Sequence, residues 1–428
     1  MRRMCTARVR RSRQDATFTP LLASPTPLAT ETQDCFDSDG LQLLKTFSIL
    51  LELVHQNPDH HIHTTEDLNL SRSTIRASKF YIQLDLEGKN YQEACYLMGI
   101  QGLLPFLRSI QRESHLKHWA GKTLAIDGYV WLHRGAYHCA QELCLGSPTK
   151  KHVEYFVQKI KLLHAFGVTA YVVFDGDHLP TQGDQKKARE EFVKAVDVTP
   201  QLAYDVILAL RSMGVKYVVA PYEADAQLRF LEMKGEVDGI ITEDSDLLVY
   251  GAQNVLFKMD PSGNCIHISR KEFGLVDDKR MGLWTDQEFR QMAMLSGCDY
   301  LSSIPGLGIK KAHDLIRRHK TAEKAIKATR LDGKLCVPPK YEQSFHRAEL
   351  TFKHQFVFDH TTRAMIPLNP LPEPLPSPES LTGCGAQWPD QVAIDVAEGR
   401  VDPFTKEPFS AQSSPGLKHL PPLRAPKQ

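Results

Sequence analysis

Four short apolar runs, separated by helical sequence, constrain the fold of this chain more than any other feature. The runs are KTLAID, VTAYVVFD, VKYVVAP and VDGIIT, at 122–127, 168–175, 215–221 and 237–242. They are rich in β-branched residues and apolar almost throughout, which is typical of strands buried on both faces. The sequence therefore predicts an α/β fold with a twisted, mostly parallel sheet that is covered by helices on both faces.

One intervening helix is well delimited by its own sequence. TPQLAYDVILALRSMG has Pro200 at the helix start and Gly214 at the stop, and Leu202, Val206 and Leu210 follow one face. We expect a helix between these two residues.

Acidic residues follow all four runs. They are Asp127, Asp175, Glu223, Asp225, Asp244 and Asp246, and a seventh, Asp299, lies in LSGCDYL at the end of a helical segment. Each by itself has an ordinary explanation as a loop acid or a helix cap. However, the carboxyl ends of parallel strands lie at one edge of a sheet, so we expect these acids to converge.

Converging carboxylates indicate a metal site. Six or seven of them in one cleft cannot all ionise unless cations neutralise them. Oxygen ligands suit Mg²⁺ or Mn²⁺, and a pair of such ions is a common device for hydrolysing phosphodiesters. In IITEDSDLL (240–248) we expect Asp244 and Asp246 to face a metal, whereas Glu243 points away or caps the next turn.

A second motif points to the substrate. SSIPGLGIKKAHDLIRRH (302–319) predicts a tight Gly-x-Gly turn between two helices, with backbone amides available to a phosphate. Lys310, Lys311, Arg317 and Arg318 follow the turn and favour duplex binding. An ordinary helical hairpin is the alternative. The net charge of +1 does not decide between them, because local patches control nucleic-acid binding.

These residues together resemble the exonuclease 1 branch of the structure-specific 5′ nuclease family. The motifs that carry the resemblance are MGIQGLLP (98–105), AIDGYVWLHRGA (125–136), VVFDG (172–176), APYEADAQL (220–228), IITEDSDLL (240–248) and LSGCDYLSSIPGLGIKKA (295–312). The resemblance implies a PIN-like nuclease core joined to a helix-turn-helix-type region that binds DNA. It also implies a Mg²⁺-dependent, monomeric nuclear 5′→3′ exonuclease on double-stranded DNA with 5′ ends, nicks or flaps, which acts in DNA mismatch repair.

The resemblance also assigns roles to individual residues. It implies that Asp127, Asp175, Glu223 and Asp225 bind one Mg²⁺ or Mn²⁺ ion, and that Asp244, Asp246 and Asp299 bind another. It places Gly99 beside the active site and Tyr129 and His133 at the unpaired or terminal nucleotides, whereas Lys310 and Lys311 are expected at the duplex from their position after the Gly-x-Gly turn. It places K⁺ at Ser296, Ser303 and Leu307.

The resemblance divides the chain into six regions. They are an unmatched extension (1–97), an amino-terminal nuclease region (98–210), an internal nuclease region (211–295), a helical duplex-binding region (296–358), a Pro-rich wrapping segment (359–409) and a disordered tail (410–428). The extension is either a misassigned start or a real addition. The longest early apolar stretch, at 47–54, is too short to cross a membrane.

Two departures from the family pattern leave alternatives open. The family has a long basic helical arch after FDG, whereas this chain has only TQGDQKK (181–187), with Gln182 in the place of the arch lysine. A protein that binds DNA and metal but cuts weakly is therefore the alternative. The chain also lacks the long tail through which the family contacts mismatch-repair proteins, which puts those partners in doubt.

A third hypothesis is a phosphatase with an aspartyl nucleophile, suggested by Asp175 and Asp177 in VVFDGD.

Overall fold

A computed structural model of the chain describes residues 99–144, 147–180, 198–276, 281 and 284–409. All of them belong to one unit, Leu70–Gln428. The unmatched extension with its apolar stretch at 47–54, the segment 181–187 and the tail from 410 lie outside the described residues. Within these ranges, no helix is both long enough and apolar enough to span a bilayer.

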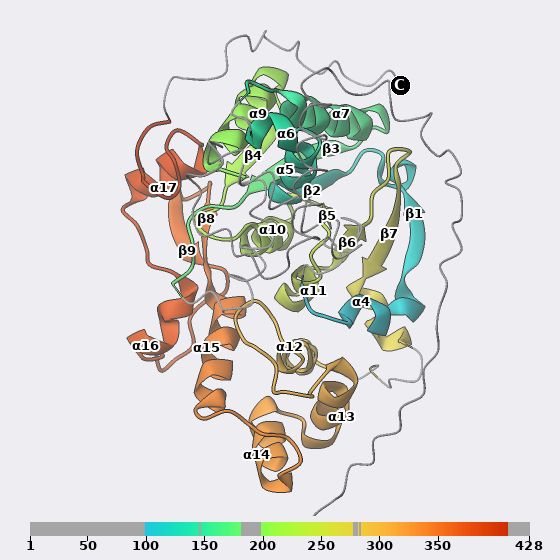
Figure 1. Ribbon diagram of the computed structural model, residues 1–428, viewed down its shortest axis with the longest axis vertical. Coiled ribbons are helices and arrows are strands. Elements are labelled where there is room, and N and C mark those ends of the chain that lie inside the picture. Colours follow the sequence, from blue (N-terminus) through green and yellow to red (C-terminus); the bar gives the residue numbers. More distant parts are fainter. Residues whose placement is uncertain (1–98, 145–146, 181–197, 277–280, 282–283, 410–428) are drawn as a thin grey trace, which may run out of the picture. The chain divides into compact units, whose positions relative to one another are not determined.

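A seven-stranded sheet forms the centre of this unit (Figure 1). Its strands are β1 (Arg112–His115), β2 (Thr123–Asp127), β3 (Thr169–Phe174), β4 (Lys216–Val219), β5 (Gly239–Ile241), β6 (Asn254–Phe257) and β7 (Asn264–Ser269). Their order is β1-β7-β6-β5-β2-β3-β4. The pairs from β6 to β4 are parallel, and β7 and β1 add an antiparallel edge. The predicted mostly parallel sheet is confirmed, and the four predicted runs form β2, β3, β4 and β5.

Helices cover both faces of the sheet. The helices of this half are α4 (Leu103–Phe106), α5 (Gly128–Tyr137), α6 (Ala140–Cys144), α7 (Lys151–Ala165), α9 (Pro200–Met213), α10 (Ala224–Met233) and α11 (Asp246–Tyr250). Ile126 and Val172 pack with α5, α7 and α9, whereas their neighbours Ala125 and Val173 pack with α10 and α11 on the opposite face. Successive strand residues thus enter two different cores, which explains why the runs are apolar throughout.

Helix α9 confirms the prediction made from its capping residues. Pro200 occupies its first turn, and Gly214 ends it with a φ of 70°. A left-handed residue at this position closes the last turn of a helix, and glycine adopts it without steric cost.

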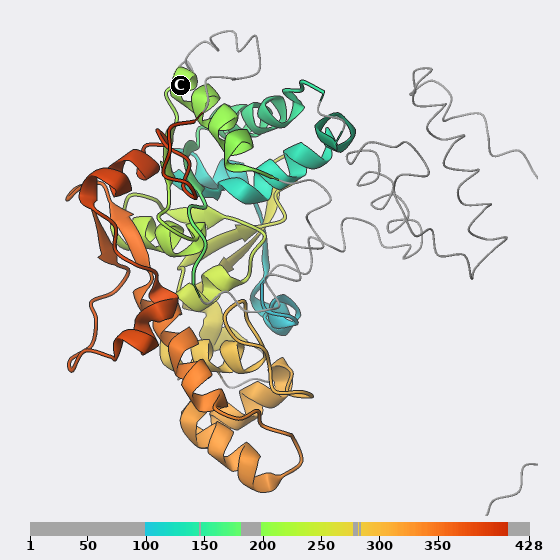
Figure 2. The ribbon, with the colours of Figure 1, turned by 60° about the vertical axis from the view of Figure 1, so that its left-hand side comes forward.

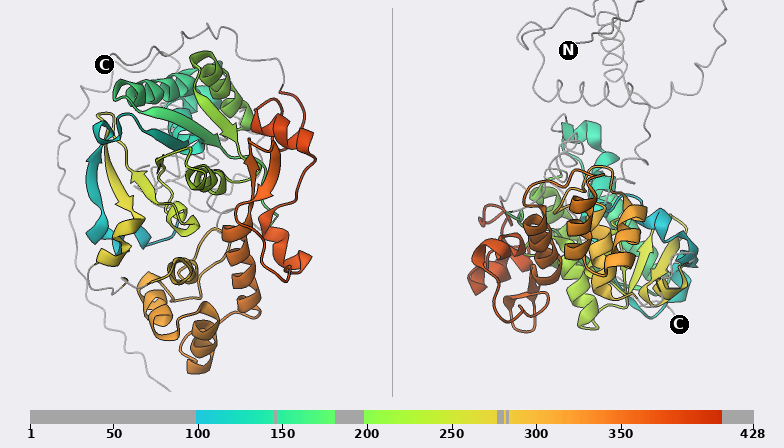
Figure 3. Two further views of the ribbon diagram at one scale, coloured as in Figure 1. Left: turned by 180° about the vertical axis from the view of Figure 1, so that it is seen from behind. Right: turned by 90° about the horizontal axis from the view of Figure 1, so that it is seen from below.

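The rest of the chain first leaves the sheet and then returns to it (Figure 2). Its elements are α12 (Asp286–Leu295), α13 (Ile309–His319), α14 (Ala322–Asp332), α15 (Tyr341–His354), β8 (Phe356–Asp359), β9 (Ala364–Pro367), α16 (Pro378–Leu381) and α17 (Asp390–Ala397). The β8–β9 hairpin contacts α10, and α17 contacts both β9 and β4 (Figure 3). Residues that are far apart in sequence therefore meet around α10.

Candidate active site at the carboxyl edge of the sheet

The register of the parallel strands brings the first acids together. Asp127 is the last residue of β2 and pairs with Val173 of β3, so Asp175 follows only two residues beyond that pair. Ile241, which ends β5, pairs with Ile126. Thr242 is therefore next to Asp127, and its hydroxyl donates a hydrogen bond to Asp127 Oδ2 over 2.9 Å.

Two helix starts bring the other strand-end acids to the same edge. Glu223 precedes α10, Asp225 lies in its first turn, and the backbone N–H of Ala224 donates to Asp175 Oδ1 over 2.6 Å. Asp246 opens α11, and its N–H donates to Asp244 Oδ1 over 2.8 Å. Carboxylates are favourable at helix N-termini because of the exposed N–H groups there. The same carboxylates therefore lie at helix N-termini and converge at one edge of the sheet.

The acids act on one another electrostatically. Burial, followed by repulsion from Asp175, raises the pKa of Asp127 from 3.8 to about 7. Burial also raises the pKa of Asp225, and repulsion by other carboxylates adds to the shift; these are Asp244, Asp127, Glu223 and Asp246. The six acids that follow β2, β3, β4 and β5 are therefore one electrostatic unit, called the acidic cluster below.

Asp299 lies close to the acidic cluster but on another element. Burial raises the pKa of its neighbour Cys298, and the charges of Asp246 and Asp299 both raise it further. The turn after α12 therefore brings the seventh predicted acid to the side of the cluster that Asp246 occupies.

The donor chemistry of the acidic cluster suits a hard divalent cation, because every donor is a carboxylate oxygen. Among the described residues, however, no three His, Cys, Asp or Glu side chains form a ready ligand set for a metal. Thr242, the Ala224 N–H and Tyr300 donate hydrogen bonds to carboxylates of the cluster. The seven acids are the residues that would hold a cation.

The raised pKa of Asp127 predicts a pH-dependent stability when cations are removed. Its pKa of about 7 in the folded protein lies above the ordinary value of 3.8, so the folded state binds the proton more tightly than the unfolded state. The free energy of unfolding should therefore be lowest above about pH 7 and rise as the pH falls toward about 4. Melting temperatures in EDTA at about pH 8 and about pH 5.5 measure this. Asp127→Asn should reduce the difference, and an unchanged difference would contradict the prediction.

Glu243 points away from the acidic cluster, as predicted. It forms a 2.9 Å ion pair with Arg134 and accepts a hydrogen bond from the Lys258 N–H over 3.1 Å. In the acidic stretch after β5, Asp244 and Asp246 therefore belong to the cluster, whereas Glu243 pairs with Arg134 outside it.

Gly99 is in direct contact with the acidic cluster. Its φ is 76°, and a Cβ atom built on it would lie 2.4 Å from Asp244 Oδ1 and 2.3 Å from Ser245 Oγ. The next residue, Ile100, donates its N–H to the same Ser245 hydroxyl over 2.9 Å. The chain around residue 99 is therefore packed against the turn that carries Asp244.

Tyr129 and His133 lie on α5, directly after Asp127. Both are half-buried, and their ring centroids are 6.0 Å apart. Burial lowers the pKa of His133 to about 4, so its imidazole is neutral at physiological pH. A neutral ring suits stacking on a base better than phosphate binding. Their contact with nucleotides stays a prediction.

The predicted phosphate-binding turn forms the connection between α12 and α13. Lys310 and Lys311 are exposed at the start of α13, and Lys311 Nζ donates to the Gly306 carbonyl over 2.8 Å. The predicted potassium positions belong to the same connection; they are Ser296, whose hydroxyl donates to the Ala293 carbonyl, the half-buried Ser303 and the buried Leu307. Duplex and K⁺ binding here stay predictions.

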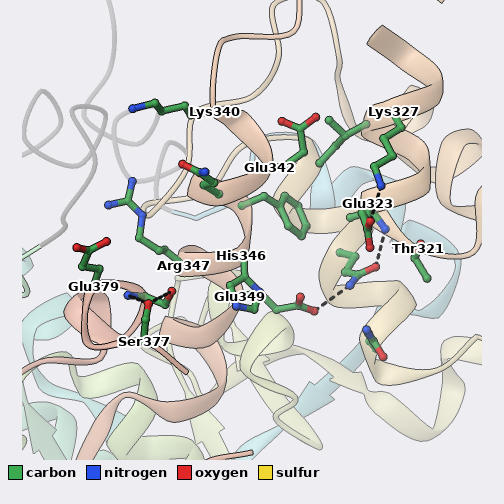
Figure 4. Close-up of a pocket in the computed structure, with 17 residues that line it drawn as sticks. Thr321, Glu323, Lys327, Lys340, Glu342, His346, Arg347, Glu349, Ser377 and Glu379 are labelled. Atoms are coloured by element: carbon green, nitrogen blue, oxygen red, sulfur yellow. Dashed lines mark hydrogen bonds and ion pairs between the residues drawn. The ribbon is translucent and has the colours of Figure 1, made fainter. Parts of the chain in front are cut away.

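A hollow of about 870 Å³ lies away from the acidic cluster, among α12, α14, α15 and α16 (Figure 4). None of the seven acids lines it. Some of its charged residues already have partners, because Lys327 forms an ion pair with Glu323 at 2.6 Å and Glu349 accepts a hydrogen bond from Gln291 over 3.0 Å. We therefore assign the function to the sheet edge, where the carboxylates converge.

Asp177, the second carboxyl group that the phosphatase hypothesis requires, is bound by other residues. Asp177 Oδ2 accepts from Lys406 Nζ over 2.8 Å, and Oδ1 accepts from the His178 N–H over 2.8 Å. The side chain is thus committed to the returning C-terminal segment, while Asp175 acts on Asp127.

Three residues that hold the acidic cluster were not predicted. Thr242 and Tyr300 lie within the motifs IITEDSDLL and LSGCDYL, next to or near the predicted acids, so a search for donors beside the acids would have found them. Gln355 donates to Glu223 from 132 positions away in the sequence. Nothing in its local sequence signals this contact.

The fold and the site define an α/β protein with a carboxylate cluster at the carboxyl edge of a parallel sheet. Two family descriptions match this part of the chain, the XPG N-terminal domain at residues 98–195 and the XPG I-region at 214–299. The two matches include all seven acids. The chain belongs to the XPG nuclease family, in its exonuclease 1 branch.

Similar proteins extend the likeness beyond these two domains. The chain is 41% identical over 341 residues to exodeoxyribonuclease 1 of Schizosaccharomyces pombe. This match covers 74% of this chain and 59% of that protein. It is 35% identical over 301 residues to the DNA damage-inducible protein DIN7 of Saccharomyces cerevisiae, covering 64% of this chain and 70% of that one. A solved catalytic core of Rad2 in complex with DNA is 19% identical, covers 70% of this chain and 98% of the other, and has a TM-score of 0.49. The chain spans about half the length of the curated relatives it matches.

Proposed function

We propose that this protein is a divalent-cation-dependent nuclease that removes nucleotides 5′→3′ from double-stranded DNA, with activity on 5′ flaps as well. The observation that carries the proposal is the acidic cluster, because carboxylates from four strand ends lie close enough that their charges add to burial in raising the pKa of Asp127 and Asp225. A protein accepts this mutual repulsion only where it is offset, and bound cations offset it. The relatives named exodeoxyribonuclease 1 and exonuclease 1 support this choice of reaction.

The residues divide into two candidate cation sites. Asp127, Asp175, Glu223 and Asp225 would hold one Mg²⁺ or Mn²⁺ ion, and Asp244, Asp246 and Asp299 would hold the other. When bound, the two ions would supply a nucleophilic water and neutralise the charge of the leaving oxygen. The protein contributes the orientation of the carboxylates through Thr242, Ala224 and Tyr300.

The substrate contacts follow from the elements around the acidic cluster. Tyr129 and His133 present half-buried rings directly after Asp127 and would stack on the terminal or unpaired nucleotides. The exposed Lys310 and Lys311 would contact the duplex backbone beside a turn that holds K⁺. A role in DNA repair in the nucleus is consistent with these contacts.

The weakly cutting alternative rests on the sequence that follows the FDG motif. The residues that take the place of the family's basic arch, 181–187, include Gln182 where the resemblance places a lysine. Removing a preorganised charge from a developing phosphate charge costs roughly 10²–10³ in rate, by analogy with oxyanion-hole deletions. On this alternative, cation and DNA binding are retained while turnover is low.

A labelled-duplex assay separates the two functions. The purified chain is incubated with 5′-recessed, blunt, nicked and 5′-flap DNA, with Mg²⁺ or with EDTA, beside Asp244→Ala. We expect Mg²⁺-dependent release of nucleotides from the 5′ end, lost in the variant. Duplex binding without cleavage by the unmodified chain supports the alternative, and cleavage that persists in EDTA contradicts both.

A further inference from the structure

The carboxylate of Glu223 is held by residues that lie outside both matched family domains. The Tyr300 hydroxyl and the Gln355 side-chain N–H both donate to Glu223 Oε2, the latter over 3.2 Å. Tyr300 is itself fixed, because its hydroxyl lies 2.6 Å from that of Tyr250. Two donors on one oxygen leave the carboxylate few rotations that keep both hydrogen bonds.

Gln355 is anchored well enough to impose this orientation. Its side chain is fully buried. Its backbone N–H donates to the Thr351 carbonyl over 3.1 Å, and its carbonyl accepts from the Leu368 N–H over 2.9 Å. The residue thus joins the end of α15 to the segment that follows β9, and its side chain has little freedom to leave Glu223.

The same C-terminal segment also binds α10 one turn further along. Gln227 Nε2 donates to the Phe358 carbonyl over 2.9 Å, and the Phe358 N–H donates back to Gln227 Oε1 over 2.8 Å. Gln227 is also buried. The helix that begins after Glu223 is therefore fastened by a reciprocal pair of hydrogen bonds to β8, immediately after Gln355.

We infer that Gln355 is a positioning residue for the cation site, acting through Glu223. The inference rests on the proposed function, because it assigns Glu223 as a cation ligand. Donors that orient a metal ligand change metal affinity by about 10–100-fold when they are removed. The C-terminal segment that contains Gln355 is then a structural part of the cation site, although it carries none of the predicted ligands.

The test compares two buried glutamines that lose the same chemical groups. Gln355→Leu removes the donor to Glu223. Gln291→Leu is the matched control, because Gln291 is also buried and also bonds a glutamate, Glu349, but lies on α12 and touches no acid of the cluster. Mn²⁺ binding to the full chain is titrated by electron paramagnetic resonance, and the Mg²⁺ concentration for half-maximal cleavage is measured beside it.

We expect Gln355→Leu to weaken Mn²⁺ binding and to raise the Mg²⁺ midpoint, each by about 10–100-fold. Gln291→Leu should lower the melting temperature and leave both values unchanged. Should Gln355→Leu fail to fold, Tyr300→Phe, which removes only the other donor, must shift both values in the same direction. If the variant that folds, Gln355→Leu or else Tyr300→Phe, binds Mn²⁺ as tightly as the unmodified chain, the inference is overturned. Absence of any Mn²⁺ binding by the unmodified chain instead overturns the proposed function and the inference with it.

Discussion

Replacing Asp225 with asparagine is expected to abolish cleavage and to raise the melting temperature of the cation-free protein. Burial and, after it, the charges of four other carboxylates raise the pKa of Asp225, so the neutral amide removes repulsion while keeping the shape. The same change deletes a proposed cation ligand. We expect cleavage to fall by at least about 10³-fold, as for loss of a major electrostatic group. Relief of repulsion is expected to add about 1 kcal/mol of stability, or roughly 1–2 °C for a unit of this size at about 2.1 cal/mol/K of unfolding entropy per residue.

Asp238→Asn is the control for this substitution. Asp238 lies just before β5, at the opposite end of the strand from the acidic cluster, where it pairs with Lys122 at 2.9 Å and accepts from the Thr123 N–H. The amide there weakens an ion pair, so the melting temperature should fall slightly while cleavage stays intact. Cleavage at the unmodified rate by Asp225→Asn would contradict the assignment of the acidic cluster as the active site.

Gly99→Ala is expected to impair cleavage although it adds no polar group and removes none. The new Cβ would lie within 2.4 Å of Asp244 Oδ1 and within 2.3 Å of Ser245 Oγ, so the turn that carries Asp244 must shift. Displacing a ligand by about 1 Å costs about 10²-fold in rate. The left-handed backbone, with a φ of 76°, adds about 1 kcal/mol of strain for a residue with a side chain.

Gly121→Ala separates the steric effect from the backbone effect. Gly121 has nearly the same φ, 77°, but nothing lies within 4 Å of its Cβ position. It should lose a similar amount of stability from strain and keep its cleavage rate. Equal losses of cleavage in both variants would show that contact with Asp244 is not the cause.

Much of the sheet was predictable because its determinants are local. The four apolar runs form β2, β3, β4 and β5, and Pro200 and Gly214 delimit α9 as expected. Strands β1, β6 and β7 were not predicted. Arg112–His115 is polar, so its local sequence does not indicate a strand. It forms one by pairing with β7, and such pairing depends on distant residues.

The sequence alone was enough to predict that acids end or follow the strands β2, β3, β4 and β5, because strand ends and the residues after them are set by short-range patterns. It also determined that Glu243 differs from Asp244 and Asp246, which the Arg134 pair now explains. The groups that hold those acids became known from the three-dimensional structure. The Gln355 contact with Glu223 joins residues 132 positions apart. No local pattern encodes it, because a hydrogen bond between distant segments depends on how the whole chain packs.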